Sequence, residues 1–592
     1  MYHSPLREIR FVMSELLASQ ELEQLYADSG YSAELADNIL EEGAKFAETV
    51  LEPLNQGGDR EGARWTPEGV LTPKGFKEAY AAYVQAGWAQ LSMSPELGGQ
   101  GLPQLLNSAV EELMFAANMG FFLGTSLARG AVEAIAASGT EAQKELVLPR
   151  LVTGEWMGTM NLTEPQAGSD LALLRTRAVP EGDHYRVFGQ KIFITYGDHD
   201  LSDNIIHLVL ARLDGAPEGV KGISLLCVPK FLINADGSIG ARNDLRCLSI
   251  EHKLGIHASP TCVMAFGEKE GAIGYLLGPP HAGLAFMFLM MNAARLSVGL
   301  QGLSQSERAL QLALEWARNR RQGKAEGRPA PVAIIEHPDV RRMLLSMKAR
   351  SEGMRALCYY VALELDRGHK LPDEPARKAA LTRAELLIPV VKGWCTETAV
   401  DVCSTGVQVH GGMGYVEETG AAQFLRDVRI ASIYEGTTGI QGNDLVGRKL
   451  GRDRGEAMAS LIQDLLGQVE TARTLLPATR AARNAALEAL IALRDLTVQL
   501  VRVQADAPAS AQAVAVPYLK LCGVTIAGAL MARAAAVAEA ALETNPGDAA
   551  FYEAKQQTCR FYAEQVLPEA IGLVRIVKSG AASVTEARTE LV

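Results

Sequence analysis

One stretch of the 592-residue sequence sets a single carboxylate among small, flexible neighbours. Residues 433–441 read IYEGTTGIQ and follow a run of helix-forming sequence. The carboxylate of Glu435 is a group that can take a proton from a substrate when it is held within hydrogen-bonding reach. Most Glu-Gly-Thr triplets are simply helix ends or turns, so this stretch gains meaning only from what accompanies it.

Two stretches upstream complete a longer pattern. Residues 160–170 read MNLTEPQAGSD, and residues 408–415 read QVHGGMGY. Taken in this order and spacing, the three stretches resemble the flavin-dependent acyl-CoA dehydrogenase family. The resemblance covers about residues 35–450, whereas residues 451–592 match only the larger members. Residues 191–200 (KIFITYGDHD) resemble a bacterial subgroup that includes fatty acyl-CoA and 3-methylmercaptopropionyl-CoA dehydrogenases.

The resemblance implies removal of hydrogen across the Cα–Cβ bond of a saturated thioester. This reaction needs a base for the Cα proton and an acceptor for the Cβ hydride, and because no side chain accepts hydride, a flavin must do so; the resemblance implies that it is FAD. Glu435 matches the family's catalytic glutamate, and Gly436 beside it leaves room for substrate. In some members the base instead precedes the arginine of a long helix. That position is Ala294 here, and residues 286–296 contain no acidic residue, so the relocated base is disfavoured.

The resemblance also assigns FAD contacts to the middle of the chain. We expect them from Met160, Leu162, Thr163, Ser169, Phe193 and Thr195. Ser169 is expected to reach the flavin pyrophosphate or the bound CoA. Most members carry Trp where Phe193 stands, so the stacking surface is kept and an indole N–H is lost.

Further FAD contacts are implied for the second half of the chain. They are Arg320, Gln408, Gly411, Gly412 and Thr437. Arg320 and the Gln408 segment are expected to reach the FAD of a partner subunit, where glycines let backbone approach phosphate closely. The sequence after Arg320 lacks the Phe that the family carries, which leaves the choice between Arg320 and Arg321 open.

Two polar residues in an apolar segment are implied to bind substrate together with Ser169 and Gly436. Asn292 and Arg295 match positions that face CoA in the family. A charge in such a segment needs a partner. Bound CoA would supply one for Arg295, and an internal salt bridge is the alternative.

The elements that position these residues follow from changes of periodicity along the chain. Residues 1–155 read as helical, with one apolar helical set at 109–119, and residues 156–280 read as short strands. The strands are expected at 184–188, 191–195, 205–211, 223–228 and 261–266. Residues 281–450 read as a helix bundle, and residues 451–592 as an additional Ala-rich helical domain. The sequence therefore predicts a mainly α fold with a central, barrel-like β-domain, similar to acyl-CoA dehydrogenases.

Composition excludes several classes of protein. The net charge is −12, and residues 451–592 carry 14 Lys+Arg against 15 Asp+Glu, which disfavours binding to nucleic acid. The eight cysteines include no CxxC pair and no zinc-ligand spacing, so we expect no metal and a cytoplasmic, reducing location. Residues 283–303 carry one charge, Arg295, but polar residues at their middle favour a buried helix over a membrane span.

The sequence thus predicts an FAD-dependent dehydrogenase that converts a medium- or long-chain fatty acyl-CoA to trans-2-enoyl-CoA in β-oxidation. The alternatives are a 3-methylmercaptopropionyl-CoA dehydrogenase, an acyl-CoA oxidase and a flavin-containing paralogue that binds nucleic acid. Electron-transfer flavoprotein is the expected acceptor. Because residues 451–592 have few charges, we expect them to cover their own bundle and to leave the protein a homodimer.

Overall fold

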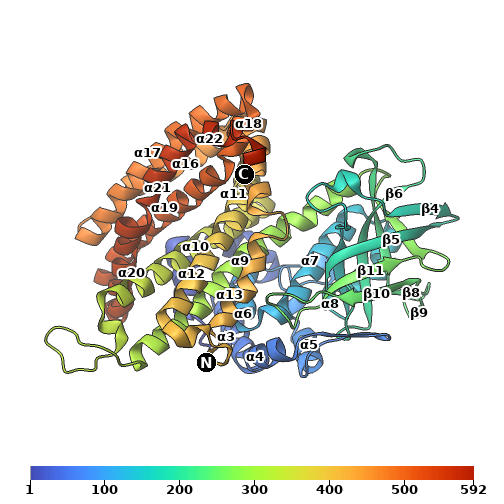
Figure 1. Cartoon of the computed structure of the whole chain (residues 1–592), viewed down its shortest axis with the longest axis horizontal. Helices are drawn as coiled ribbons and strands as arrows, with labels where there is room; N and C mark the ends of the chain where they lie inside the picture. The colour runs from blue at the N-terminus through green and yellow to red at the C-terminus, as the bar shows by residue number, and fades with distance from the viewer. Residues whose placement is uncertain (1, 592) are drawn as a thin grey trace. The chain divides into compact units, whose positions relative to one another are not determined.

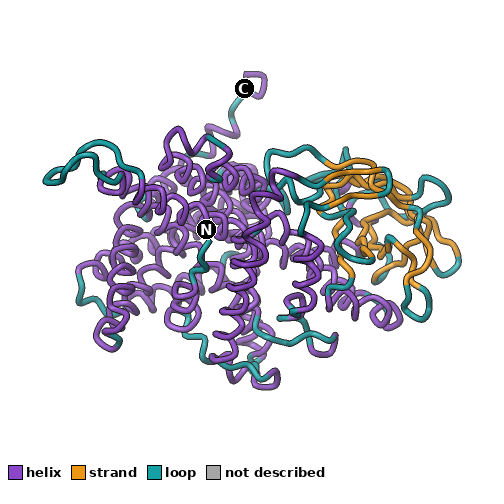
Figure 2. The backbone as a smooth tube through the Cα atoms, turned by 90° about the horizontal axis from the view of Figure 1, so that it is seen from below, coloured by secondary structure: helices purple, strands orange, loops and turns teal. Residues whose placement is uncertain are grey.

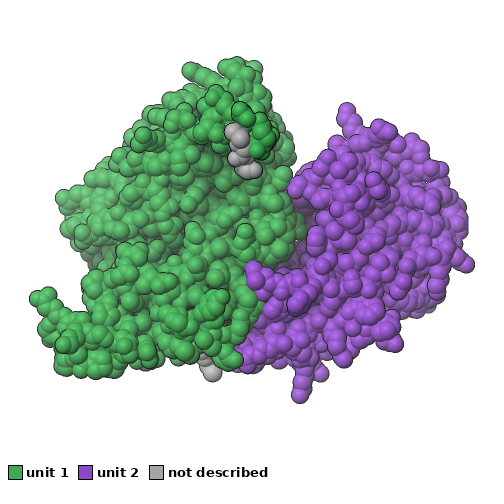
Figure 3. Space-filling view, viewed as in Figure 1, with its two compact units in different colours: residues 1–28, 32–40, 298–592 green, residues 29–31, 41–297 purple. Residues whose placement is uncertain are grey.

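The computed structural model describes residues 2–591, except for the side chains of residues 289 and 591. The chain divides into two compact units (Figure 3). The strand-containing unit comprises residues 29–31 and 41–297, and the helical unit comprises the residues up to 28, residues 32–40 and the chain from 298 onward. Helices α3 (Ala33–Phe46) and α9 (Gly283–Asn319) belong partly to each.

In the strand-containing unit, helices precede the sheet. They are α4 (Glu52–Glu61), α5 (Phe76–Gln85), α6 (Gln104–Ala117), α7 (Met119–Ser138) and α8 (Glu141–Thr153). Asn118 separates α6 from α7, because its side chain accepts a hydrogen bond from the backbone N–H of Phe121 at 3.0 Å and so caps α7. The helical set expected at 109–119 is therefore divided at this residue.

The strands lie in this unit as well (Figure 2). They are β1 (Arg64–Thr66), β2 (Gly69–Leu71), β3 (Trp156–Asn161), β4 (Arg177–Glu181), β5 (His184–Thr195), β6 (Asn204–Leu213), β7 (Ile223–Pro229), β8 (Phe231–Ile233), β9 (Ile239–Arg242), β10 (Leu245–Ile250), β11 (Thr261–Phe266) and β12 (Ala272–Leu277). The main sheet runs in the order β10-β11-β5-β12-β7-β6-β3, with β4 paired to β5 and β6.

Strands β3 and β7 are buried along their whole length, as is most of β6, as expected for strands that are covered on both faces. On one face, Ile135 of α7 and Leu148 of α8 share a core with Trp156 and Leu208. The strands expected at 205–211, 223–228 and 261–266 are confirmed. Those expected at 184–188 and 191–195 form one strand, since the chain continues through Gly189 and Gln190 without a break.

The helical unit contains the long bundle helices and those that follow them (Figure 1). They are α1 (Leu6–Arg10), α2 (Glu21–Leu25), α10 (Pro338–Lys370), α11 (Glu374–Val390), α12 (Thr396–His410), α13 (Ala421–Val428), α14 (Thr438–Asn443), α15 (Gly451–Asp453), α16 (Glu456–Glu470), α17 (Pro477–Asp506), α18 (Pro508–Ala513), α19 (Ala515–Thr544), α20 (Ala549–Phe561), α21 (Glu569–Ser579) and α22 (Ala581–Thr585). The predicted mainly helical fold with a central β-domain is confirmed. The four segment boundaries drawn from the sequence remain a prediction.

Helix α19 packs closely against the segment that follows α11. A Cβ on Gly523 would lie 2.2 Å from the Trp394 ring, and one on Gly393 would lie 2.8 Å from Leu519. Helices α9 and α19 are long and apolar enough to span a membrane, a test that core helices also pass; of their most apolar windows, 53% and 83% are buried within the protein. The eight cysteines are buried free thiols.

Candidate active site

Glu435 lies in a loop with an unusual backbone. Its φ is +54°, and that of Gly436 is +87°. A left-handed conformation is uncommon for a residue with a side chain, and it persists only where the surroundings impose it. The loop ends at α14, where the Thr437 hydroxyl accepts a hydrogen bond from the N–H of Ile440 at 3.3 Å. The half-buried side chain of Glu435 is thus presented from a constrained turn.

Two fully buried side chains, Lys392 and Gln441, donate hydrogen bonds to the backbone of this loop. The Lys392 ammonium donates a hydrogen bond of 2.6 Å to the carbonyl oxygen of Gly436. The Gln441 amide donates to the carbonyl oxygens of Glu435 and Gly436, at 3.1 and 3.2 Å. Both carbonyls that flank the turn are therefore satisfied by side chains from the bundle, which fixes the direction in which Glu435 leaves the backbone.

The residues on either side of the turn are anchored as well. The Tyr434 hydroxyl donates to Gln301, and the Thr438 hydroxyl donates to Glu397 at 2.6 Å. Burial, together with the adjacent charge of Glu435, raises the pKa of Tyr434 far above its ordinary value. Tyr434 therefore stays neutral and acts as an anchor rather than as an acid or base.

Lys392 was not identified from the sequence. It is the lone charge in the apolar run 386–395 (LLIPVVKGWC), and a buried charge requires a partner. The lone charge could have been noticed in the sequence. The partner of Lys392, the Gly436 carbonyl, could not be identified, because it lies 44 residues further along the chain. Gln441 carried no signal at all, because a glutamine near the end of a motif is usually a surface residue.

The residues expected to contact the flavin ring lie on the strand-containing unit, at the ends of β3 and β5. The N–H of Ile192 donates to the Thr163 carbonyl at 2.9 Å, and the Thr159 hydroxyl donates to the Thr195 carbonyl at 2.7 Å. Met160 is 8% exposed, whereas Phe193 is 59% exposed at a φ of +59°. The fold thus brings the predicted segments 160–163 and 193–195 together.

A buried ion pair fixes the loop after Thr163. The Lys191 ammonium lies 2.8 Å from Glu164 and also donates to the Leu162 carbonyl at 2.9 Å. Burial alone would raise the pKa of Glu164, but Lys191 outweighs it and lowers the pKa to about 2. Burial lowers the pKa of Lys191 to about 8. Both groups are charged at neutral pH, so the pair holds the loop electrostatically. Both residues lie in motifs identified from the sequence, but their pairing was not predicted.

This surface fits the isoalloxazine ring and polar tail of FAD. An aromatic ring exposed on a strained backbone offers a stacking face. Among residues 2–591, the Thr163 and Ser169 hydroxyls have no hydrogen-bond partner, and a Cβ on Gly168 would meet nothing within 4 Å. The donors and the open backbone that a flavin with its phosphates requires are therefore present.

In the helical unit, the predicted FAD-contact segment 408–412 lies close to the end of α9, the helix that leads to Arg320. The His410 ring stacks on Trp316, with centroids 5.2 Å apart, which places the loop after α12 beside the end of α9. Gln408, Gly411 and Gly412 are exposed, and a Cβ on either glycine would meet open space. Burial lowers the pKa of His410, and its Nδ1 lies 2.7 Å from the Gly406 carbonyl. His410 therefore has a packing role here.

Arg320 and Arg321, between which the sequence left a choice, differ in their surroundings. The Arg320 side chain is exposed and has no hydrogen bond or ion pair within the described part of the chain. The Arg321 guanidinium donates to the Pro331 carbonyl at 3.5 Å. Arg320 is therefore the better placed of the two to bind an external phosphate or adenine.

The remaining predicted substrate residues lie on α9. Arg295 is 3% exposed and Asn292 is half-buried. Their contact with CoA stays a prediction. Among the residues that the structure describes, no group of three or more His, Cys, Asp or Glu side chains could hold a metal ion.

Comparison with protein-family models yields four consecutive matches. They are the acyl-CoA dehydrogenase N-terminal domain at residues 34–155, the middle domain at 159–268, the C-terminal domain at 281–450, and the acetyl-CoA dehydrogenase C-terminal-like domain at 456–588. The predicted resemblance is confirmed over nearly the whole chain, including the segment that follows the bundle.

Individual relatives agree. The chain is 47% identical over 574 residues to a 3-methylmercaptopropionyl-CoA dehydrogenase of Ruegeria pomeroyi, covering 96% of each chain. It is 36% identical over 592 residues to a broad-specificity linear acyl-CoA dehydrogenase of Mycobacterium tuberculosis, again covering 96% of each. The fold matches the crystal structure of Caenorhabditis elegans ACDH-11 in complex with C11-CoA, with a TM-score of 0.78, 19% identity, and coverage of 100% of this chain and 96% of that one. The protein therefore belongs to the acyl-CoA dehydrogenase family of FAD-dependent enzymes.

Proposed function

We propose that this acyl-CoA dehydrogenase oxidises a short acyl-CoA, such as 3-methylmercaptopropionyl-CoA, with Glu435 as the base. The role of Glu435 is supported mainly by its constrained backbone within the family's catalytic motif. Buried Lys392 and Gln441 hold this backbone by hydrogen bonds. The substrate is supported by the name of the 47% identical relative. A medium- or long-chain fatty acyl-CoA, expected from the sequence, remains the second candidate, because another relative is named for linear acyl-CoAs.

In the proposed reaction, the Glu435 carboxylate takes the proton from the substrate Cα, and a double bond forms between Cα and Cβ. Bound FAD supplies the acceptor for the hydride that leaves Cβ. Lys392 and Gln441 keep the carboxylate in a fixed orientation during proton transfer. Phe193, Thr163 and Ser169 are the residues of the strand-containing unit that would hold the flavin.

A small cavity supports the location of the acyl chain. Its volume is ≈ 10 Å³, and it lies between α7 and α9, lined in part by Gly130, Met290 and Ala294. Ala294 is the position from which some family members project their base, so the Cα of the substrate is expected nearby. The two helices cross closely here, since a Cβ on Gly130 would lie 2.5 Å from Met290. A cavity with room for about one water molecule can take only the tip of an acyl group, which supports a short, unbranched one.

For the electron acceptor we propose an electron-transfer flavoprotein rather than oxygen, as the family resemblance implies. An oxidase is the competing possibility. Reduced enzyme should react slowly with dissolved oxygen and rapidly with electron-transfer flavoprotein. Stopped-flow reoxidation by each acceptor separates the two, and rapid reoxidation by oxygen would assign the protein as an oxidase.

The substrate proposal is tested by measuring kcat/KM for 3-methylmercaptopropionyl-, butyryl-, octanoyl- and lauroyl-CoA with the FAD-loaded protein. We expect the two short thioesters to give the highest values. A maximum at octanoyl- or lauroyl-CoA would replace the short-chain proposal by the fatty acyl-CoA alternative. Absence of turnover with all four would contradict the proposed activity itself.

A further inference from the structure

An ion pair lies between two small cavities of the strand-containing unit. The first cavity is the one between α7 and α9. The second, of ≈ 30 Å³, is lined by aromatic side chains that include Tyr80, Tyr83 and Trp88. Only Glu111, Ser126 and Arg129 line both cavities. These three side chains therefore form the wall that divides them.

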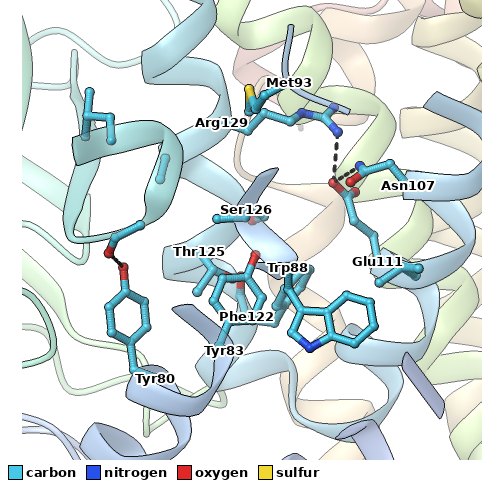
Figure 4. Close-up of a pocket in the computed structure, with 15 residues that line it drawn as sticks. Tyr80, Tyr83, Trp88, Met93, Asn107, Glu111, Phe122, Thr125, Ser126 and Arg129 are labelled. Atoms are coloured by element: carbon cyan, nitrogen blue, oxygen red, sulfur yellow. Dashed lines mark hydrogen bonds and ion pairs between the residues drawn. The ribbon is translucent and has the colours of Figure 1, made fainter. Parts of the chain in front are cut away.

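The wall is charged and well anchored (Figure 4). The Arg129 guanidinium lies 3.1 Å from Glu111, and the Asn107 amide donates to the same carboxylate oxygen at 2.9 Å. The side chains of Arg129 and Glu111 are 12% and 8% exposed. The Ser126 hydroxyl donates to the Leu123 carbonyl at 3.0 Å, so it too is held in place.

Charge makes this wall a barrier to apolar chains. An alkyl chain that reached the pair would have to displace a guanidinium and a carboxylate from each other, and a separated buried charge is strongly destabilising. Beyond the pair, the larger cavity offers aromatic and aliphatic surface, including Met93 and Phe122. Its volume has room for about two water molecules, whereas the first cavity has room for about one.

We propose that the Arg129–Glu111 pair determines the acyl-chain length that this enzyme accepts, by closing the acyl site from the aromatic cavity behind it. The inference rests on the proposed function, in which the acyl chain ends at the cavity between α7 and α9. Short acyl groups end before the pair. Longer groups reach it and lose affinity, although further space, lined in part by aromatic rings, lies directly behind.

The test variant removes both charges of the pair together: Arg129→Ala with Glu111→Gln. Glu133, whose carboxylate lies 3.7 Å from the Arg129 guanidinium, loses that partner, but its side chain is 43% exposed and can be solvated by water. This change joins the two cavities, and the glutamine can still bond Asn107. We expect the ratio of kcat/KM for octanoyl-CoA to that for butyryl-CoA to rise at least tenfold over wild type. Each newly buried methylene contributes about fourfold, from ~0.8 kcal/mol at 1.36 kcal/mol per tenfold.

Two control variants isolate the cause. Lys144→Met with Glu141→Leu removes another ion pair of the same unit, 2.9 Å long, whose residues line neither cavity, and should leave the ratio unchanged. Ala89→Leu fills only the aromatic cavity. It should leave the wild-type ratio unchanged but cancel the gain when it is added to the double variant.

Dissociation constants for the same acyl-CoA series are measured beside kcat/KM on FAD-loaded protein. If wild type shows no turnover, the proposed function fails, while a step in affinity between butyryl- and octanoyl-CoA would still support the barrier. A folded double variant with an unchanged ratio would overturn the proposal. If the variant does not fold, the dissociation constants of wild type test the proposal instead. Equal affinity for all chain lengths from butyryl- to lauroyl-CoA would overturn the proposal.

Discussion

The backbone at Glu435 is strained, and two buried side chains compensate for the strain. A residue held in a sparsely populated conformation costs on the order of 1–3 kcal/mol. A hydrogen bond from a charged donor contributes roughly 1.5–3 kcal/mol, so the bond from Lys392 to Gly436 is large enough to offset it. Gln441 adds two weaker bonds. This strain is therefore retained where it orients the proposed base.

Replacing Lys392 by methionine should impair positioning without removing the base. We expect Lys392→Met to lower kcat by up to about 10²-fold, the scale associated with a misplacement of 1 Å, while FAD content is kept. Lys378→Met, on the exposed side of the preceding helix, is the matched control and should behave as wild type. Steady-state kinetics and the pH profile of kcat measure the effect. Unchanged kcat in Lys392→Met would remove Lys392 from its positioning role.

The sequence identified the residues that belong to motifs but not those that support them. Glu435, Thr163 and Gln408 were named because their neighbours form recognisable stretches. Lys392, Gln441 and the Arg129–Glu111 pair depend on contacts between helices far apart in the sequence, and a single sequence contains no record of such contacts. The lone charge of Lys392 in an apolar run indicated only that a partner must exist.

At the scale of elements, periodicity located the strands and helices but not the positions at which they continue or break. Strand β5 was expected as two pieces, because Gly189 and Gln190 interrupt its alternation, yet pairing with β11 and β12 carries the strand through. Residues 109–119 were expected to form one helical segment, because their apolar residues keep helical spacing. The break at Asn118 could not be predicted, since this residue caps α7 only once the chain turns there. In β5, tertiary pairing overrides local propensity. Between α6 and α7, the capping of α7 by Asn118 overrides it.

Helix α1 is joined to α10 and α20 by a buried charge cluster. The Lys555 ammonium lies 2.5 Å from Glu8 and 2.7 Å from Glu352. Burial would raise the pKa of Glu8, but Lys555 and Lys348 outweigh it and lower the pKa to about 2. A carboxyl whose pKa is lowered on folding stabilises the protein above its unfolded pKa, and this stabilisation disappears as the pH falls toward 2.

Replacing Glu8 by glutamine should therefore destabilise the protein at neutral pH and progressively less in acid. A shift from 4.5 to about 2 corresponds to a stabilisation on the order of 3 kcal/mol. Urea unfolding of wild type and Glu8→Gln, compared between pH 7 and pH 3, measures the difference. Glu590→Gln, exposed near the C-terminus, is the control. A deficit of the same size at both pH values would exclude the ionisation of Glu8 as its cause.

At the scale of the whole molecule, the helices after residue 450 pack on the bundle of their own unit. Gly523 and Gly393 allow close approach of α19 to the Trp394 segment, and α19 is largely buried. The sequence predicted such a helical extension from its few charges and high alanine content. The surface that it covers could not be predicted, because that depends on which helix faces are left open after the bundle has formed.

We predict that the protein is a homodimer. The extension covers bundle surface that would otherwise be free to bind a second dimer, while Arg320 and the Gln408 segment are expected to reach the FAD of a partner. Light scattering should give about 127 kDa, which is twice the chain mass of 63.5 kDa. Deletion of residues 451–592 should cause aggregation or higher oligomers. A stable tetramer of the intact protein would contradict the covering role of the extension.

The central claim is that Glu435 removes the Cα proton of an acyl-CoA. It is tested most directly by mixing FAD-loaded wild type and Glu435→Gln with 3-methylmercaptopropionyl- or butyryl-CoA without oxygen and following the flavin absorbance. Wild type should bleach rapidly. The variant, which keeps its fold and its FAD, should bleach at least 10²–10⁴-fold more slowly, whereas Glu488→Gln on the exposed side of α17 should match wild type. Bleaching of Glu435→Gln at the wild-type rate would contradict the account.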